Sequence, residues 1–122
     1  MHHVDVHVSD AVASRRFFDA IMPLVGYEPR VDSSSEFAYW CAERRPAIAF
    51  TLDADRSGSG SMRIAFAVPT SADVDRAAAA AAHHGARNIE GPGIHPEYGD
   101  EYYAVFFEDL DGNKFEVCLA DT

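Results

Sequence analysis

The feature that most constrains the fold is an internal repeat with a spacing of 60 residues. The first copy begins with the alternating run 3–8 and the second with the run 63–68. A shift of 60 superimposes three apolar positions of each run: Val4, Val6 and Val8 on Ile64, Phe66 and Val68. A helix candidate follows each run and ends near a glycine, Gly26 or Gly85. The chain therefore contains one supersecondary unit twice.

Each copy is predicted to contain one strand, one helix and three further strands. Apolar periodicity and turn residues predict strands over 3–8, 27–31, 36–41, 47–52, 63–68, 87–89, 102–108 and 114–119, and helices over 11–22 and 72–84. Ser9 or Asp10 is expected to cap the first helix, whose apolar stripe would contain Val12, Phe17 or Phe18, and Ile21. A long loop is expected over 91–100, with an Asp111-Gly112 turn after it.

These elements predict a single α+β domain of two paired βαβββ modules, about 1–56 and 62–122, that form a curved sheet around a central pocket. The Gly/Ser-rich segment 53–61 would separate the modules, with the break near 57–61. Because strand residues alternate between faces, the valines would pack on the helices. The opposite faces, with His3, Asp5 and His7 in one module and Arg63 in the other, would line the pocket.

Charge limits the partners of the chain. The net charge of −10 repels phosphate backbones and anionic lipid, so nucleic acid and membranes are not expected as partners. A small molecule is therefore the expected ligand, although an acidic composition also increases solubility without any specific partner. The two cysteines, Cys41 and Cys118, form no CxxC motif, and no stretch reaches the ~18 apolar residues of a membrane span. The expected location is the cytoplasm.

The two ends of the chain carry recognisable motifs. The opening 3–10, followed by Phe17-Phe18, and the ending 102–117, with Asp109-Leu110-Asp111-Gly112-Asn113 before Glu116, resemble the vicinal oxygen chelate superfamily. That superfamily includes glyoxalase I, extradiol dioxygenases, and the fosfomycin- and bleomycin-resistance proteins. The resemblance implies the paired-module fold and a homodimer. It does not select a reaction, because this fold carries many chemistries.

The resemblance also implies where a metal would bind. In metalloenzymes of the superfamily the ligands fall at the positions of His3, Arg63 and Glu116, and Glu116 would also be the catalytic residue. Guanidinium has no lone pair to donate, so Arg63 cannot be a ligand. A divalent metal (Fe, Ni, Mn or Zn) is therefore expected to bind weakly or not at all. The strand 47–52 also has no carboxylate, which argues against the glyoxalase I reaction.

Two functional hypotheses follow from this. One is a metal-dependent lyase, isomerase or dioxygenase that uses His3 and Glu116. The other is a metal-free binding protein, similar to bleomycin-resistance proteins, which trap a cationic drug between aromatic and acidic side chains. In either case the expected ligand contacts are Arg63, Tyr103, His7 and Trp40. Arg63 itself has three alternatives: a position at the pocket rim, an ion pair with Glu116, or a contact with a ligand carboxylate.

Overall fold

The computed structural model describes residues 3–30, 36–41, 47–52 and 62–120 of the chain. The expected break near 57–61 lies outside these residues. The first repeat contains β1 (His3–Val8), α1 (Ala11–Ile21), the 3-10 turn η1 (Met22–Val25), β2 (Glu28–Arg30), β3 (Glu36–Trp40) and β4 (Ala47–Leu52). The second contains β5 (Arg63–Val68), α2 (Ser71–His83), β6 (Arg87–Ile94), the 3-10 turn η2 (Pro96–Tyr98), β7 (Tyr103–Glu108) and β8 (Lys114–Leu119). The predicted α+β class and the order β-α-β-β-β in each repeat are confirmed.

Each repeat folds its strands into one four-stranded sheet. The strand order is β1-β4-β3-β2 in the N-terminal sheet and β5-β8-β7-β6 in the C-terminal sheet. In both sheets the first strand lies parallel to the last one, and the other pairings are antiparallel. The sequence repeat is thus matched by a repeat in sheet topology.

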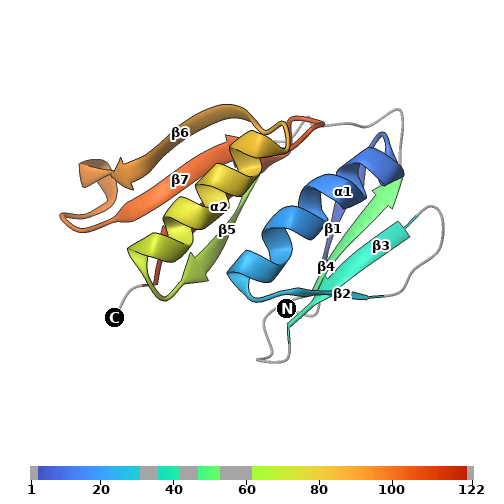
Figure 1. Cartoon of the computed structure of the whole chain (residues 1–122), viewed down its shortest axis with the longest axis horizontal. Coiled ribbons are helices and arrows are strands. Elements are labelled where there is room, and N and C mark those ends of the chain that lie inside the picture. The colour runs from blue at the N-terminus through green and yellow to red at the C-terminus, as the bar shows by residue number, and fades with distance from the viewer. Residues whose placement is uncertain (1–2, 31–35, 42–46, 53–61, 121–122) are drawn as a thin grey trace.

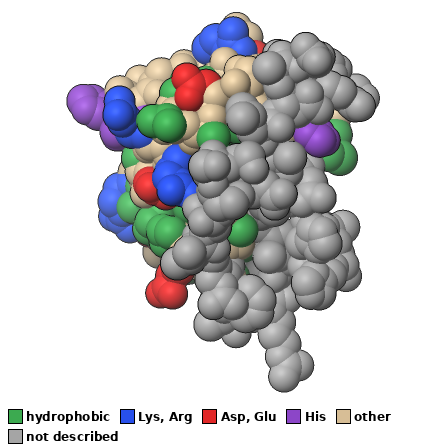
Figure 2. All heavy atoms as spheres, turned by 90° about the vertical axis from the view of Figure 1, so that its right-hand side faces the viewer, with side chains coloured by type: hydrophobic (Ala, Val, Ile, Leu, Met, Phe, Trp, Pro, Cys, Tyr) green, Lys and Arg blue, Asp and Glu red, His purple; other side chains and the backbone are tan. Residues whose placement is uncertain are grey.

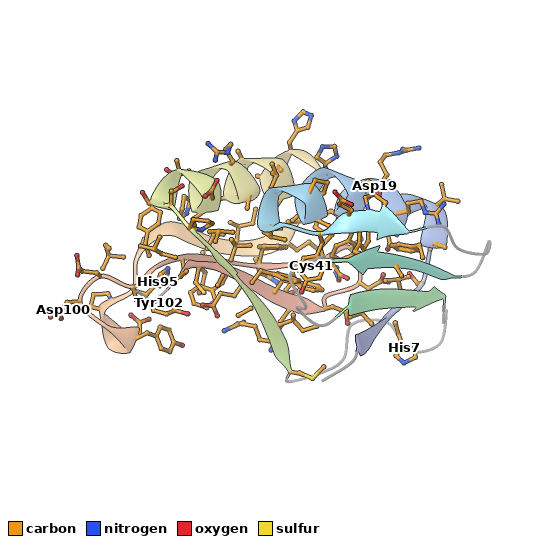
Figure 3. The ribbon with its side chains drawn as sticks, turned by 90° about the horizontal axis from the view of Figure 1, so that it is seen from below. His7, Asp19, Cys41, His95, Asp100 and Tyr102 are labelled. Carbon is orange, nitrogen blue, oxygen red and sulfur yellow. The ribbon has the colours of Figure 1, made fainter. Side chains whose placement is uncertain are left out.

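Both helices cover the same side of the two sheets. They lie next to each other in Figure 1, and Figure 3 shows the strands on the opposite side of them. Aromatic rings of α1 reach the C-terminal sheet: the Phe18 ring centroid lies 5.3 Å from that of Phe115, and the Phe17 centroid 6.4 Å from that of Phe107. Buried residues of both repeats belong to one hydrophobic cluster. The two modules therefore share a core, and their second sheet faces are left uncovered by helices.

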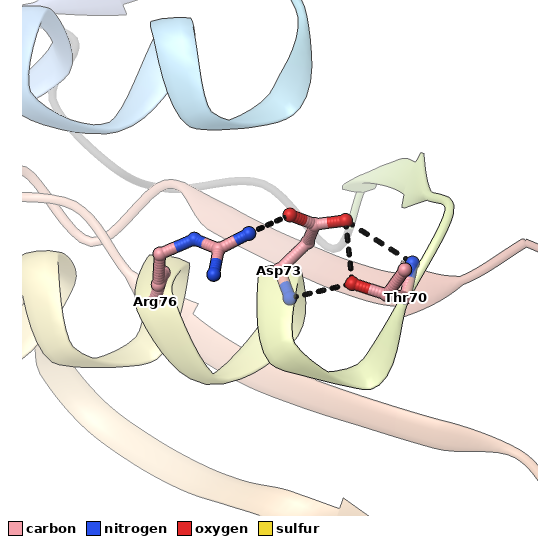
Figure 4. A network of polar contacts seen from close by, with 3 residues as sticks. All are labelled: Thr70, Asp73 and Arg76. Carbon is pink, nitrogen blue, oxygen red and sulfur yellow. Dashed lines mark hydrogen bonds and ion pairs between the residues drawn. The ribbon is translucent and has the colours of Figure 1, made fainter.

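The helix starts follow from their capping residues. Asp10 caps α1, because its side chain accepts a hydrogen bond from Ala13 N at 3.0 Å. Thr70 and Asp73 form a reciprocal capping box at α2, and Arg76 pairs with the same Asp73 carboxylate (Figure 4). The expected place of Val12 in the apolar stripe is wrong. Val12 is 71% exposed, because the buried side of α1 contains Ser14, which lies two residues on and so on a different side of the helix.

The segment 91–100 is also corrected. Its first part belongs to β6, which continues to Ile94 and pairs Gly93 with Ala104. Glycine and proline had suggested a loop, but β6 is an edge strand with two register irregularities, where proline and glycine are tolerated. The rest of the segment contains the short turn η2.

The side of the molecule shown in Figure 2 carries side chains of both charges. Among the side chains described on that side of the molecule, basic, acidic and apolar groups are interspersed, and no patch of one sign stands out. The net negative charge therefore does not mark a docking surface there. No helix in the described parts of the chain is long and apolar enough to cross a membrane.

A polar joint at Asp109 connects the β7–β8 turn with the N-terminal repeat. The Asp109 carboxylate is fully buried and accepts hydrogen bonds from Asp111 N, Asn113 N and Asn113 Nδ2 at 2.8–2.9 Å. Asn113 Nδ2 also donates to the His7 carbonyl at 2.9 Å, and Ser9 donates to Asp111. Burial raises the pKa of Asp109, and the hydrogen bonds from Asn113 and Asp111 oppose that shift. The motif 109–113, on which the resemblance partly rests, thus connects the two repeats structurally.

We predict that Asp109→Ala lowers the free energy of unfolding by about 2–5 kcal/mol, because each buried donor left without a partner costs about 1–3 kcal/mol. Urea unfolding followed by circular dichroism measures the loss. Asp111→Asn is the matched control and should cost less than about 1 kcal/mol, since its bonds to Ser9 are exposed. Equal losses in the two variants would contradict the assigned role of Asp109.

Candidate site on the open face of the C-terminal sheet

The candidate site lies on the face of the C-terminal sheet that no helix covers, which we call the open face. Strand alternation places Phe66 and Val68 of β5 toward the helices, and their neighbours Arg63, Ala65 and Ala67 on the open face, where all three are exposed. In register, Ala65 of β5 lies beside Glu116 of β8, and Glu116 lies beside Phe106 of β7. This row of three residues forms the middle of the site.

Glu116 is the buried carboxylate of the open face, with 7% of its surface exposed. Its Oε2 accepts a hydrogen bond from the hydroxyl of Tyr102, which comes directly before β7. Burial, and next the hydrogen bond to Glu116, raise the pKa of Tyr102 far above its ordinary value. Tyr102 therefore remains a proton donor to Glu116 and fixes the orientation of this carboxylate.

Cys118 lies two residues further along β8, in register with Ala104 and Ala67. It is half-buried and has no disulfide partner. Burial raises the pKa of its thiol, and the charge of Glu116 raises it further, while a hydrogen bond with Tyr102 opposes the shift. Since the thiolate is the nucleophilic form, Cys118 is a poor nucleophile at neutral pH.

The Arg63 guanidinium contacts an aromatic ring and not the Glu116 carboxylate, which was one of its predicted partners. Its guanidinium carbon lies 4.7 Å from the centre of the Phe106 ring, a cation–π contact that contributes about 0.5–1 kcal/mol at an exposed site. Since β8 separates β5 from β7, the side chain must extend across β8 to reach this ring. No ion pair with Glu116 forms among the described residues, and the carboxylate bonds to Tyr102 instead. The Arg63–Glu116 pairing is thus wrong, and the guanidinium fork is left for another partner.

The segment after β6 closes one side of the open face. His95 packs its ring edge-on against Phe106 with 4.8 Å between the centroids, and His95 Nε2 lies 3.2 Å from the Ala104 carbonyl oxygen. Tyr98 follows, with its ring 5.4 Å from the Tyr102 ring and 6.2 Å from that of Phe106. Phe106 therefore has His95 and Tyr98 on one side and the Arg63 guanidinium on another.

The structure does not bring all predicted residues together. Arg63 and Glu116 share the open face, but Figure 3 places His7 at the opposite end of the molecule from Tyr102 and His95. Tyr103, which was predicted to contact the ligand, lies on the helix-covered face instead. Its hydroxyl donates a hydrogen bond to Asp75 of α2 at 2.5 Å. The tyrosine beside Glu116 is Tyr102. The side chains of His3 and Trp40 lie outside what the structure describes.

The residues of the open face do not fit a divalent metal. No group of three His, Cys, Asp or Glu side chains that could hold an ion occurs among the described residues. Arg63 supplies only donors, and Tyr102 already bonds to an oxygen of Glu116. The chemistry these residues can perform is hydrogen bonding and charge recognition at an aromatic surface.

Phe106 is the site residue that sequence analysis missed. The strands β7 and β8 pair symmetrically about Asp111, so counting back from the Asp111-Gly112 turn places residue 106 opposite residue 116. The same count places Tyr102 on the face of Phe106 and Glu116, and Tyr103 on the opposite face. The sequence therefore contained the information that identifies Phe106, but this information lay in the pairing register of the strands and not in the residue type.

Comparison with known proteins shows the family and the fold of the chain. The profile of the Glyoxalase/Bleomycin resistance protein/Dioxygenase superfamily matches residues 1–117. A glyoxalase/bleomycin resistance protein from Albidiferax ferrireducens T118 superimposes with a TM-score of 0.84 at 25% identity, over 98% of each chain. A putative glyoxalase from Bacillus halodurans gives a TM-score of 0.77 at 25% identity, over 98% of this chain and 95% of its own.

More distant in sequence is the fosfomycin resistance protein FosX from Listeria monocytogenes, solved in complex with Mn(II) and sulfate ion. It gives a TM-score of 0.75 at 20% identity, over 99% of this chain and 90% of its own, and this likeness concerns the fold. A search of the curated proteins found no match to the sequence.

We predict that Tyr102 gives the protein a specific loss of stability in alkali. The raised pKa means that the native state holds the phenolic proton more tightly than the unfolded state does. This contribution is complete below the ordinary tyrosine pKa of 10.0 and is lost as the pH rises through the folded value. Guanidinium unfolding between pH 8 and 11.5 should therefore show wild type losing stability relative to Tyr102→Phe above about pH 10. Parallel curves for the two proteins would contradict the Tyr102–Glu116 bond.

Proposed function

Because the chain belongs to the Glyoxalase/Bleomycin resistance protein/Dioxygenase superfamily, we propose that it binds a small molecule with a carboxylate group on the open face of its C-terminal sheet, without a resident metal. The observation that supports this proposal is the position of Arg63 over Phe106, away from Glu116. Arg63 occupies the place that the resemblance assigns to a metal ligand. A fixed cation replaces the ion there as the group that recognises ligand oxygens.

The local charges favour an anion at this end of the face. Arg63 lies in register beside Lys114 of β8, and Lys114 lies in register beside Glu108 of β7, so this end of the face carries two cationic side chains and one carboxylate despite the acidic composition of the chain. A guanidinium presents paired donors that match the two oxygens of a carboxylate. Phe106 is buried beneath the guanidinium and helps to hold it in position. Glu116, held by Tyr102, can accept a hydrogen bond from a hydroxyl or amine elsewhere on the ligand.

A second candidate function is metal-dependent catalysis with His3 and Glu116. It is favoured by the Mn(II) complex of FosX, a protein of the same fold, and by the position of His3 at the start of β1, equivalent to that of Arg63 in β5. A lyase, isomerase or dioxygenase reaction would then require further ligands from solvent or substrate. Metal titration separates this candidate from the first.

We also propose that the chain forms a homodimer. Ala65 and Ala67 are exposed on the open face, and a second copy packed against this face would bury them and enclose the ligand between modules. Sedimentation equilibrium should give a mass near two chains at micromolar concentration. A mass near one chain would contradict this proposal and would leave the ligand site untouched.

The carboxylate proposal is tested with benzoate as the probe and neutral benzamide as its isostere. We expect saturable shifts of the Phe106 ring signals in NMR titrations with benzoate, and at least tenfold weaker binding of benzamide. Arg63→Ala should weaken benzoate binding by about tenfold or more, because a hydrogen bond to a charged group contributes about 1.5–3 kcal/mol.

Arg16→Ala is the matched control for this titration. Arg16 is exposed on α1, on the helix side of the molecule, and its removal changes the net charge by the same amount. Benzoate affinity should stay within about twofold of wild type, because an exposed charge at this distance is screened by salt. If Arg16→Ala weakens binding as much as Arg63→Ala does, the effect reflects net charge and the assigned site is wrong.

We predict weak or absent binding of nickel, manganese and ferrous iron by the wild type, and a gain of binding on Arg63→His. Imidazole would add a nitrogen ligand at the matched position, whereas guanidinium supplies none. Isothermal titration of both proteins measures the difference, and Arg63→Lys is the control that removes the fork without adding a ligand at neutral pH. Equal metal affinity in wild type and Arg63→His would mean that position 63 is not a ligand position.

A further inference from the structure

A cavity of about 590 Å³ opens at the end of the C-terminal sheet, away from the Arg63 end of the open face. It is lined by Pro69 after β5, Leu119 and Ala120 at the end of β8, and the segment 98–102. Its volume is within the range of ligand sites, about 300–1,000 Å³. The ring of Tyr102 lines it, while the hydroxyl of the same residue bonds to Glu116.

The lining has one sign of charge. It contains the carboxylates of Asp100 and Glu101, and no Lys, Arg or His. Among the described residues neither carboxylate has an ion-pair or hydrogen-bond partner. Figure 3 shows Asp100 at the outer tip of this end of the molecule, beyond Tyr102. Both residues are exposed, and two acidic side chains at the cavity attract cations.

The lining also has an aromatic part. The rings of Tyr98 and Tyr102 stand 5.4 Å apart at an angle of 50°, so they form two adjoining walls and not a closed stack. Tyr98 is 60% exposed, which is unusual for a large ring and leaves its surface available to a ligand. Aromatic faces attract cations through their quadrupole, and they do so most strongly for ammonium groups that are easily desolvated.

We propose that this cavity binds a small organic cation of the alkylammonium type, with Tyr98 and Tyr102 contacting the alkylammonium carbons and Asp100 and Glu101 supplying the charge. The proposal goes beyond the carboxylate site, because the cavity would take a ligand of the opposite charge. The two sites adjoin where Tyr102 bonds to Glu116 and where the Tyr98 ring lies 6.2 Å from that of Phe106. Arg63 stands at the start of β5 and Pro69 just after its end, six residues on, which is about 20 Å along a strand.

Choline is the probe, and 3,3-dimethylbutan-1-ol, which replaces its nitrogen by carbon, is the neutral isostere. We expect saturable NMR shifts of the Tyr98 and Tyr102 rings with choline, and at least tenfold weaker binding of the neutral isostere. Asp100→Asn combined with Glu101→Gln should weaken choline binding at least tenfold, and so should Tyr98→Leu. Neither change touches a buried residue, so folding should be retained.

Two controls separate this site from net charge and from the carboxylate site. Glu28→Gln combined with Glu90→Gln removes two exposed charges outside the cavity and should leave choline affinity within twofold. Arg63→Ala should also leave it unchanged, even if benzoate binding is lost or never observed. Equal binding of choline and its neutral isostere, absence of a saturable choline shift, or equal losses in the two double variants would overturn the proposal.

Discussion

The packing of both helices on one side of both sheets is the constraint on which the rest of this structure depends. Phe17 and Phe18 of α1 bring aromatic surface from the first repeat onto strands of the second, and Phe115 stacks against Phe66 and Phe107 within that sheet. A buried aromatic ring contributes several kcal/mol, and truncating one in a core typically costs about 3–5 kcal/mol. The helices are therefore committed to one face of each sheet, and the opposite face is where polar side chains can gather without cost to the core.

Strand register then decides which side chains gather there. The Asp109 joint fixes the β7–β8 turn, and the turn fixes the pairing that sets Phe106 beside Glu116. A slip of one residue would bring Val117 and Phe115 to the open face and bury Glu116 in the aromatic core. Two buried acidic residues of the C-terminal repeat therefore have linked roles. Asp109 fixes the conformation of the turn, and the turn fixes the strand register that positions Glu116.

Sequence alone predicted most of the fold, because the repeat and the strand alternation depend on local pattern. The alternation also predicted Arg63 on the pocket face, whereas Glu116 was placed there by the resemblance. It did not predict the contact of Arg63 with Phe106, since that contact crosses a strand adjacent in the sheet but distant in sequence. Tyr103 was preferred to Tyr102 because the start of the strand was uncertain by one residue, and one residue is the difference between the two faces.

The two repeats have the same topology but not the same chemistry, and the parallel strand pairs show why. In the second repeat Ala65 pairs with Glu116, and in the first the equivalent pair is Asp5 with Ala49. The last strand of the first repeat therefore offers no carboxylate where that of the second does, while β1 begins with His3 where β5 begins with Arg63. Donor groups suited to a metal are thus divided between the repeats, and the open face of the second combines a guanidinium, a phenol and a carboxylate. The proposal that fixed side chains recognise the ligand rests on this combination, because an aromatic ring lies against the guanidinium and the phenol donates to the carboxylate.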